Sequence, residues 1–192
     1  MIEGRTDAAA VVRHLKEYFA GTTGLVFLTS LPNTRGGRPG EQSITTRLPS
    51  EITNFVEKWD RPGRGLFFCV STLKPDSQPT QFGSLRCKAN CAELPCLFTD
   101  IDFERLKDEV ENPQAEVFRR LQAMDPAPCA VNVSGGGLHA YWRLQSPIAT
   151  AGFEAAEEAL RVLTARLGGD PQCCEVARLL RLPGSVNSKP GR

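Results

Sequence analysis

The chain has 192 residues and carries 23 basic against 22 acidic side chains, so its formal net charge at pH 7 is +1. This length allows one large domain or two small modules, each with enough residues for a hydrophobic core. The near-neutral balance excludes binding of nucleic acid through overall positive charge, so any such contact has to be a local patch. No apolar run is long enough to span a membrane and no signal peptide is present, which predicts a cytoplasmic protein.

The N-terminal part of the chain alternates helix and strand signals. The expected elements are a helix capped by Asp7, a strand over 25–30, a long mobile loop over 32–49, a helix capped by Ser50 and a strand over 66–70. Two arginine-rich turns, 35–38 and 61–64, are candidates for contacts with phosphate groups of a nucleic acid, although a solvated loop is the favoured reading of each.

The first chemical signal is the run from Cys96 to Asp102, which predicts a buried strand. Side chains alternate along a strand, so Asp100 and Asp102 share one face while Ile101 points into the core. Two adjacent carboxylates repel each other, and an oxygen-binding divalent cation such as Mg²⁺ or Mn²⁺ relieves that repulsion. Asp-x-Asp alone is a weak signal, and two solvated acids at a strand end fit it equally well.

The second signal is a glycine-rich turn that joins two short strands, 131–133 and 138–144. The run Ser134-Gly-Gly-Gly137 permits positive φ angles, and its successive N–H groups can form a nest for an anion. His139 leaves this turn in a position to bind a phosphate. The alternative is a hairpin with a surface histidine. The only other histidine, His14, lies in the first predicted helix, so His139 is the candidate for the site.

The third signal combines an acid with a basic run. Asp170 follows a clear amphipathic helix that ends at Gly168-Gly169, and Arg178 and Arg181 are spaced to share a face of a helical turn stopped by Pro183-Gly184. Paired arginines suit triphosphate binding because guanidinium groups donate two parallel hydrogen bonds. The alternative is an amphipathic helix with a solvated basic face.

Seven cysteines occur, and a cytoplasmic chain is expected to keep them reduced. Cys87, Cys91 and Cys96 cluster before the first motif and could form a zinc site with Cys69, Cys173 or Cys174. The spacing lacks a Cys-x-x-Cys pair, so zinc is the less favoured interpretation.

Taken together and in this order, the three motifs resemble the catalytic domain of the archaeo-eukaryotic primase superfamily, and in particular the primase-polymerase domains of phage and plasmid replication proteins. They span residues 98–189, about half of the chain. The resemblance implies an α+β fold in which an N-terminal α/β module packs on an RRM-like antiparallel sheet, with the active site in the cleft between them. The implied domain is 1–192, with a boundary near residue 85, and it looks like the catalytic part of a longer replication protein.

The resemblance also implies roles for individual residues. The two catalytic Mg²⁺ or Mn²⁺ ions would be held by Asp100, Asp102 and Asp170, with Glu175 as a rival third ligand. His139, Ser134, Gly137, Arg178, Arg181 and either Asn187 or Lys189 would bind the nucleotide. Many relatives have a serine where this chain has Gly137, so either the Ser134 hydroxyl or the backbone takes over that contact.

The implied activity is template-dependent nucleotidyl transfer on single-stranded or primed DNA by a DNA primase or polymerase that uses NTPs or dNTPs. DNA and the nucleotide are the expected partners, together with a helicase domain or protein. Extension without robust initiation is expected, because relatives use a downstream helical domain to initiate. The alternatives are an inactive nucleic-acid-binding module and a metal-dependent nuclease or strand transferase.

Overall fold

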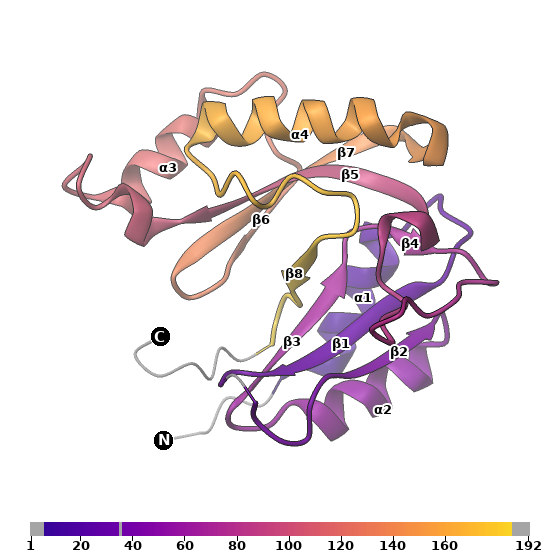
Figure 1. The fold of residues 1–192 in the computed structure, drawn as a ribbon. Helices are drawn as coiled ribbons and strands as arrows, with labels where there is room; N and C mark the ends of the chain where they lie inside the picture. Colours follow the sequence, from indigo (N-terminus) through magenta and orange to yellow (C-terminus); the bar gives the residue numbers. More distant parts are fainter. Residues whose placement is uncertain (1–5, 35, 186–192) are drawn as a thin grey trace.

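The structure is a computed structural model, and it describes residues 6–34 and 36–185. It contains two four-stranded antiparallel sheets that lie one above the other, each with helices packed on it (Figure 1). The α+β fold predicted from the sequence resemblance is therefore confirmed.

The first sheet has the strand order β2-β1-β3-β8. Its helices are α1, which is capped by the Asp7 carboxylate as predicted, and α2. The elements are α1 (Ala8–Tyr18), β1 (Val26–Pro32), β2 (Gln42–Thr46), α2 (Pro49–Trp59), β3 (Arg64–Cys69) and β8 (Leu179–Arg181).

The second sheet has the strand order β4-β5-β7-β6, and α3 and α4 cover the face that points away from the first sheet (Figure 1). Two long strands, β5 and β7, pair along most of their length and form its centre. The elements are β4 (Thr72–Leu73), β5 (Cys91–Asp102), α3 (Pro113–Gln122), β6 (Ala130–Val133), β7 (Gly137–Ala149) and α4 (Phe153–Leu167), with short 3₁₀ turns at Lys88–Asn90, Phe103–Leu106 and Thr150–Gly152.

Two strands connect the halves of the chain. β4 comes from the N-terminal part but pairs with β5, whereas β8 comes from the C-terminal part but pairs with β3. The two sheets are thus tied together by the chain as well as by packing.

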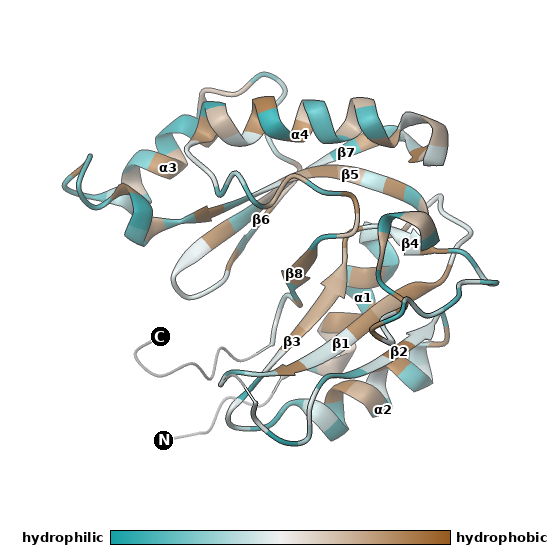
Figure 2. Cartoon of the chain, viewed as in Figure 1, coloured by the Kyte–Doolittle hydropathy of each residue, from teal (hydrophilic) through white to brown (hydrophobic). Residues whose placement is uncertain are grey.

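One hydrophobic cluster joins the two sheets. Phe68 of β3, Phe98 of β5 and Tyr141 of β7 are all almost fully buried in it, and Tyr18 of α1 makes edge contacts with the rings of Phe68 and Tyr141. A second, smaller cluster fills the space between the second sheet and its helices. Figure 2 shows the hydrophobic residues running along β1 and β3, and hydrophilic bands alternating with hydrophobic ones along α4.

Three local expectations were wrong. The segment 32–49 is not one long loop, because β2 forms inside it and pairs with β1. The second helix begins at Pro49, with Leu48 rather than Ser50 at its N-cap. No helical turn carries the arginine pair, because residues 179–181 are extended and pair with β3. Strand pairing decides the first and third cases, with the preceding strand β1 in the first and with the distant strand β3 in the third.

Arg64, a candidate for template contacts, is buried and holds a loop. Its guanidinium donates to the carbonyls of Ser30 and Gly40 at 2.8 and 2.9 Å and packs over the Trp59 ring at 5.1 Å. Because these contacts occupy the group, Arg64 stabilises the fold and does not face solvent.

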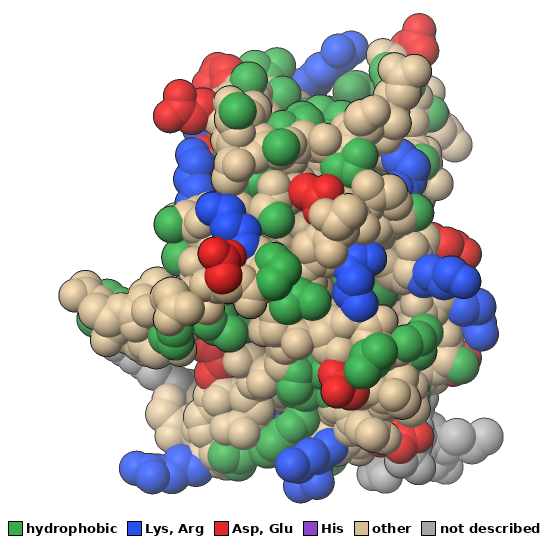
Figure 3. All heavy atoms as spheres, turned by 90° about the vertical axis from the view of Figure 1, so that its right-hand side faces the viewer, with side chains coloured by type: hydrophobic (Ala, Val, Ile, Leu, Met, Phe, Trp, Pro, Cys, Tyr) green, Lys and Arg blue, Asp and Glu red, His purple; other side chains and the backbone are tan. Residues whose placement is uncertain are grey.

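The surface has mixed charge. On the face shown in Figure 3, acidic and basic side chains are interspersed over the whole view. None of the described helices is long and apolar enough to cross a membrane.

Candidate active site

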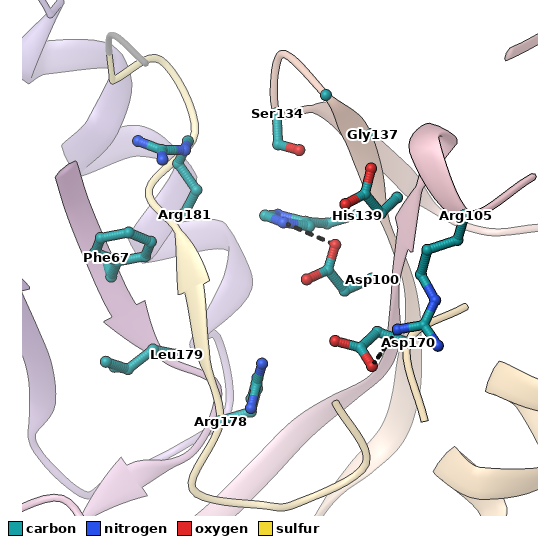
Figure 4. Close-up of a pocket in the computed structure, with 12 residues that line it drawn as sticks. Phe67, Asp100, Arg105, Ser134, Gly137, His139, Asp170, Arg178, Leu179 and Arg181 are labelled. Atoms are coloured by element: carbon teal, nitrogen blue, oxygen red, sulfur yellow. Dashed lines mark hydrogen bonds and ion pairs between the residues drawn. The ribbon is translucent and has the colours of Figure 1, made fainter. Parts of the chain in front are cut away.

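A polar pocket of about 310 Å³ lies between the two sheets, and side chains from both form its walls (Figure 4). The three sequence motifs, which are far apart in the chain, meet here. The lining residues are Phe67, Asp100, Asp102, Arg105, Ser134, Gly136, Gly137, His139, Asp170, Arg178, Leu179 and Arg181.

The alternation of β5 brings its two acids to the pocket. Asp100 and Asp102 line it, and Phe98 on the same face continues into the core between the sheets. Ile101, on the opposite face, is completely buried under the helices. An oxygen of Asp102 accepts the backbone N–H of Glu104 at 3.0 Å, which fixes this carboxylate at the end of the strand.

Asp170 reaches the same wall because the loop after α4 lies directly on β5. Its N–H donates to the carbonyl of Asp100 at 2.8 Å. A side chain at Gly169 would meet Thr99 at 2.5 Å and the backbone of Asp100 at 2.9 Å, so only glycine permits this approach. The absence of a side chain at residue 169 thereby places the Asp170 carboxylate beside that of Asp100.

Two further side chains hold these acids. Arg105 forms an ion pair with Asp170 at 3.0 Å. The thiol of Cys173 is completely buried and lies 3.5 Å from an oxygen of both Asp100 and Asp170. Burial raises the pKa of this thiol, with the Asp100 charge next in importance, so Cys173 remains a neutral donor between two carboxylates.

His139 lies opposite Asp100 in the β5–β7 ladder. Its Nε2 is 3.5 Å from an Asp100 oxygen, its Nδ1 is 3.4 Å from the Tyr141 hydroxyl, and its side chain is buried. Burial lowers the pKa of His139, while the Asp100 carboxylate raises it and the Arg181 charge lowers it. The balance favours a neutral ring.

The glycine-rich turn lies at the start of β7 and closes the pocket on that side. A side chain at Gly137 would stand 2.0 Å from the carbonyl oxygen of Ile101, so a serine has no room at this position. Ser134 lines the pocket from the start of the turn, and Figure 4 shows its hydroxyl pointing into the space between Arg181 and Gly137. The Ser134 hydroxyl and the backbone of the turn, the two alternatives for the missing serine, both lie at this end of the pocket.

The opposite wall belongs to the first sheet. Arg181 pairs with Phe67 across β8 and β3, and its guanidinium stacks on the Phe67 ring at 5.0 Å. It is only 8% exposed, and its Nη1 atom is buried without a hydrogen-bond partner in the described part of the chain. Burial lowers the pKa of Arg181. Arg178 precedes the strand and bonds more weakly to Gln172 and Glu175, at 3.3 and 3.5 Å.

The segment between Asp170 and Arg181 is fixed along its length. The N–H of Val176 donates to Glu157 of α4 at 3.1 Å, and its carbonyl accepts the Ser71 hydroxyl at 2.7 Å. Arg86 donates to the neighbouring carbonyl of Ala177 at 2.8 Å. This segment therefore runs from one wall of the pocket to the other in a defined conformation.

Sequence reasoning missed three lining residues, Phe67, Arg105 and Leu179, and also the thiol of Cys173, which lies beneath the acids and does not line the pocket. The rival acid Glu175 is exposed and does not line the pocket. Asn187 and Lys189 lie outside the described residues.

The donors on the acidic wall fit a hard divalent cation. Asp100, Asp102 and Asp170 offer carboxylate oxygens only, which suits Mg²⁺ or Mn²⁺. They are not gathered in advance, since residues 6–34 and 36–185 contain no group of three Cys, His, Asp or Glu side chains ready to hold a metal. All seven cysteines are free thiols.

Solved structures of similar fold come from primases. The archaeo-eukaryotic primase domain of the cyanophage S-2L primase-polymerase matches with a TM-score of 0.63 and 17% identity, covering 98% of this chain and 88% of that one. The primase RepB′ matches with a TM-score of 0.55 and 13% identity over 96% of this chain, which spans about half (52%) of the RepB′ chain. The RepB′ catalytic domain, solved in complex with initiator DNA, gives the same score and identity, with coverage of 95% of this chain and 79% of that one.

The two packed sheets have the fold of an archaeo-eukaryotic primase domain, as the sequence resemblance predicts. The chain belongs to the family described as the RepB DNA-primase N-terminal domain, whose sequence model matches residues 97–192. This membership assigns it to DNA-primase-type nucleotidyltransferases. Curated protein sequences give no match.

Proposed function

We propose that this domain catalyses template-dependent nucleotidyl transfer on DNA, joining the α-phosphate of an NTP or dNTP to a primer 3′-hydroxyl with two bound Mg²⁺ or Mn²⁺ ions. Family membership supports the class of reaction. The pocket supports the residue roles and the choice of substrate.

One observation carries the proposal. Arg181, whose buried Nη1 atom has no hydrogen-bond partner among the described residues, lines the pocket on the wall opposite Asp100 and Asp170 (Figure 4). A buried donor without a partner is costly, so such a group in a pocket wall suits an anionic ligand. A triphosphate with its divalent cations would satisfy both walls at once.

Each residue has a separate role in this proposal. Arg181, with Arg178 beside it, binds the triphosphate, and the hydroxyl of Ser134 and the ring of His139 add donors from the other wall. Mg²⁺ or Mn²⁺ held by Asp100, Asp102 and Asp170 would lower the pKa of the attacking hydroxyl and neutralise the departing pyrophosphate.

In this proposal the primer and template lie at the opening of the pocket, so that the primer 3′-hydroxyl reaches the bound nucleotide. The RepB′ catalytic domain has been solved with initiator DNA, and the present domain shares its fold over most of the chain. We propose a DNA template or primer as the partner, and a helicase domain or protein as the source of the unwound strand.

The first test is extension of a labelled primer on a template, with Mg²⁺ or Mn²⁺ and either dNTPs or NTPs. Asp100→Asn keeps the shape of the side chain and removes its charge. Asp76→Asn, at an exposed loop position away from the pocket, is the matched control. We expect metal-dependent elongation by the wild type and the control, and its near-complete loss in Asp100→Asn.

A second readout separates chemistry from binding. Titration with Mn²⁺ should show weaker binding for Asp100→Asn than for Asp76→Asn. Elongation and Mn²⁺ binding that both survive Asp100→Asn would overturn the assignment. DNA binding without elongation would favour an inactive binding module, and DNA cleavage would favour a nuclease.

A further inference from the structure

Tyr141 follows His139 on the same face of β7, and it is buried and does not line the pocket. Its side chain is 1% exposed, and its ring packs with those of Tyr18 and His14 at centroid distances of 5.6 and 6.2 Å. Its hydroxyl lies 3.4 Å from Nδ1 of His139. A ring fixed in this way presents its hydroxyl in one position.

The chemistry of the partners decides which atom donates. An ionised carboxylate only accepts hydrogen bonds, so the approach of an Asp100 oxygen to 3.5 Å from Nε2 favours a proton on that nitrogen of His139. A neutral imidazole carries one proton, and the burial of His139 favours the neutral ring. Nδ1 is then an acceptor, and the Tyr141 hydroxyl has to donate to it.

We propose that Tyr141 is the positioning residue of this site, whose hydroxyl donates to Nδ1 of His139 and so keeps the proton on Nε2, where it faces the pocket. This role rests on the proposed function only for its consequence, that Nε2–H donates to a phosphate oxygen of the nucleotide. With the proton on Nδ1 instead, His139 would present a lone pair to an anion and repel it.

The importance of Tyr141 increases when Asp100 is engaged elsewhere. In the proposed reaction the Asp100 carboxylate binds a cation, so its contact with Nε2 no longer directs the proton. The Tyr141 hydroxyl is then the remaining group that determines the tautomer. Groups that hydrogen-bond to metal-binding histidines act in this way at many metal sites, where a hydrogen bond to one ring nitrogen determines the protonation of the other.

The chain offers a matched control. It contains two tyrosines, and Tyr18 is buried in the same cluster, but its hydroxyl donates to the carbonyl of Val70. Tyr18→Phe and Tyr141→Phe therefore each remove one buried hydroxyl from neighbouring rings, and only the second touches His139. The chain also contains two histidines, so His14→Phe assigns the histidine spectrum.

The tautomer can be read directly by long-range ¹H–¹⁵N correlation of ¹⁵N-histidine-labelled protein. We expect the Nε2–H form in the wild type, in Tyr18→Phe and in Asp100→Ala, and a mixture of tautomers in the Asp100→Ala/Tyr141→Phe protein. Nδ1–H in the wild type, or pure Nε2–H in the double variant, would overturn the proposal. The wild-type spectrum alone decides the first point even if the double variant does not fold.

Nucleotide binding gives the second arm. Tyr141→Phe should weaken NTP or dNTP binding by roughly 2- to 10-fold, the usual effect of one buried hydrogen bond, while Tyr18→Phe should leave it unchanged. A changed tautomer with unchanged nucleotide affinity would uphold the role of Tyr141 and contradict the proposed contact between His139 and phosphate. The failures of the two ideas are thus distinguishable.

Discussion

Gly137 provides the most direct test of how the pocket is built. An alanine Cβ there would lie 2.0 Å from the carbonyl oxygen of Ile101, 2.9 Å from its carbonyl carbon and 3.0 Å from Cα of Asp102. All three atoms are backbone, so no rotation of a flexible side chain can relieve the overlap. Gly137→Ala, and more so the Gly137→Ser change that restores the serine of many relatives, must push β5 and β7 apart.

The size of the effect follows from the geometry. Ordinary contact begins near 3.4 Å, so the strands have to separate by about 1.4 Å at the pair formed by Gly137 and Asp102. Overpacking typically costs about 1–3 kcal/mol, and a purely backbone overlap belongs at the upper end or above it. For a domain of this length, about 3 kcal/mol lowers the melting temperature by roughly 6–12 °C.

The assay is thermal unfolding followed by circular dichroism, with Gly40→Ala as the control because a Cβ at Gly40 meets nothing within 4 Å. The control should melt within about 2 °C of the wild type, as expected for an unconstrained surface change. If Gly137→Ala melts with the control, the close approach of β5 and β7 does not exist and the reasoning about the missing serine fails.

Three further predictions concern the surroundings of the site. Burial lowers the pKa of His14 to about 4, below its ordinary value, so the unfolded chain takes up the proton first and stability is lost as pH falls from about 6.5 towards 4; urea unfolding of His14→Phe should show a smaller loss over this window than the wild type. Gly65→Ala should weaken nucleotide binding several-fold with little change in melting temperature, because a Cβ would stand 2.8 Å from the Phe67 ring and displace it. Arg105→Ala should tighten Mn²⁺ binding by up to about 5-fold in calorimetry, because the exposed cation paired with Asp170 competes with the metal.

Each of these has a clear contrary outcome. An equal pH dependence in His14→Phe and the wild type would assign the acid sensitivity to other groups. Unchanged nucleotide affinity in Gly65→Ala would show that the position of the Phe67 ring does not affect nucleotide binding. Weaker Mn²⁺ binding in Arg105→Ala would mean that this arginine orients the carboxylate for the metal.

The parts of the site that follow from local patterns were accessible from the sequence. The alternation around Asp100 and Asp102 needs only the two-residue period of a strand, and the glycine run before His139 predicts a tight turn, in which Gly135 has a φ of 96°. Gly168, at a φ of 74°, ends α4 as its position predicts. These features depend only on residues that are close together in the chain, so a short stretch of sequence is enough to predict them.

The parts that depend on distant partners were not accessible. The three residues of β8 are extended because they pair with Phe67 and its neighbours, more than 100 positions earlier, and their own apolar and basic pattern fits a helix equally well. Arg105 and Cys173 carry no motif, and their roles arise from the docking of the loop after α4 onto β5. Phe67 reads as an ordinary core residue until β8 places Arg181 beside it.

The short segment that joins Asp170 to Arg181 has a consequence for how this domain can change. It carries the last carboxylate of one wall and the buried guanidinium of the other, and contacts at Val176 and Ala177 fix its course. Its length therefore sets the distance between the proposed cation-binding carboxylate and the proposed phosphate-binding guanidinium. Substitutions along the segment leave the separation of these two groups unchanged, whereas inserting or deleting a residue would change it. This stretch should therefore vary in composition and keep its length.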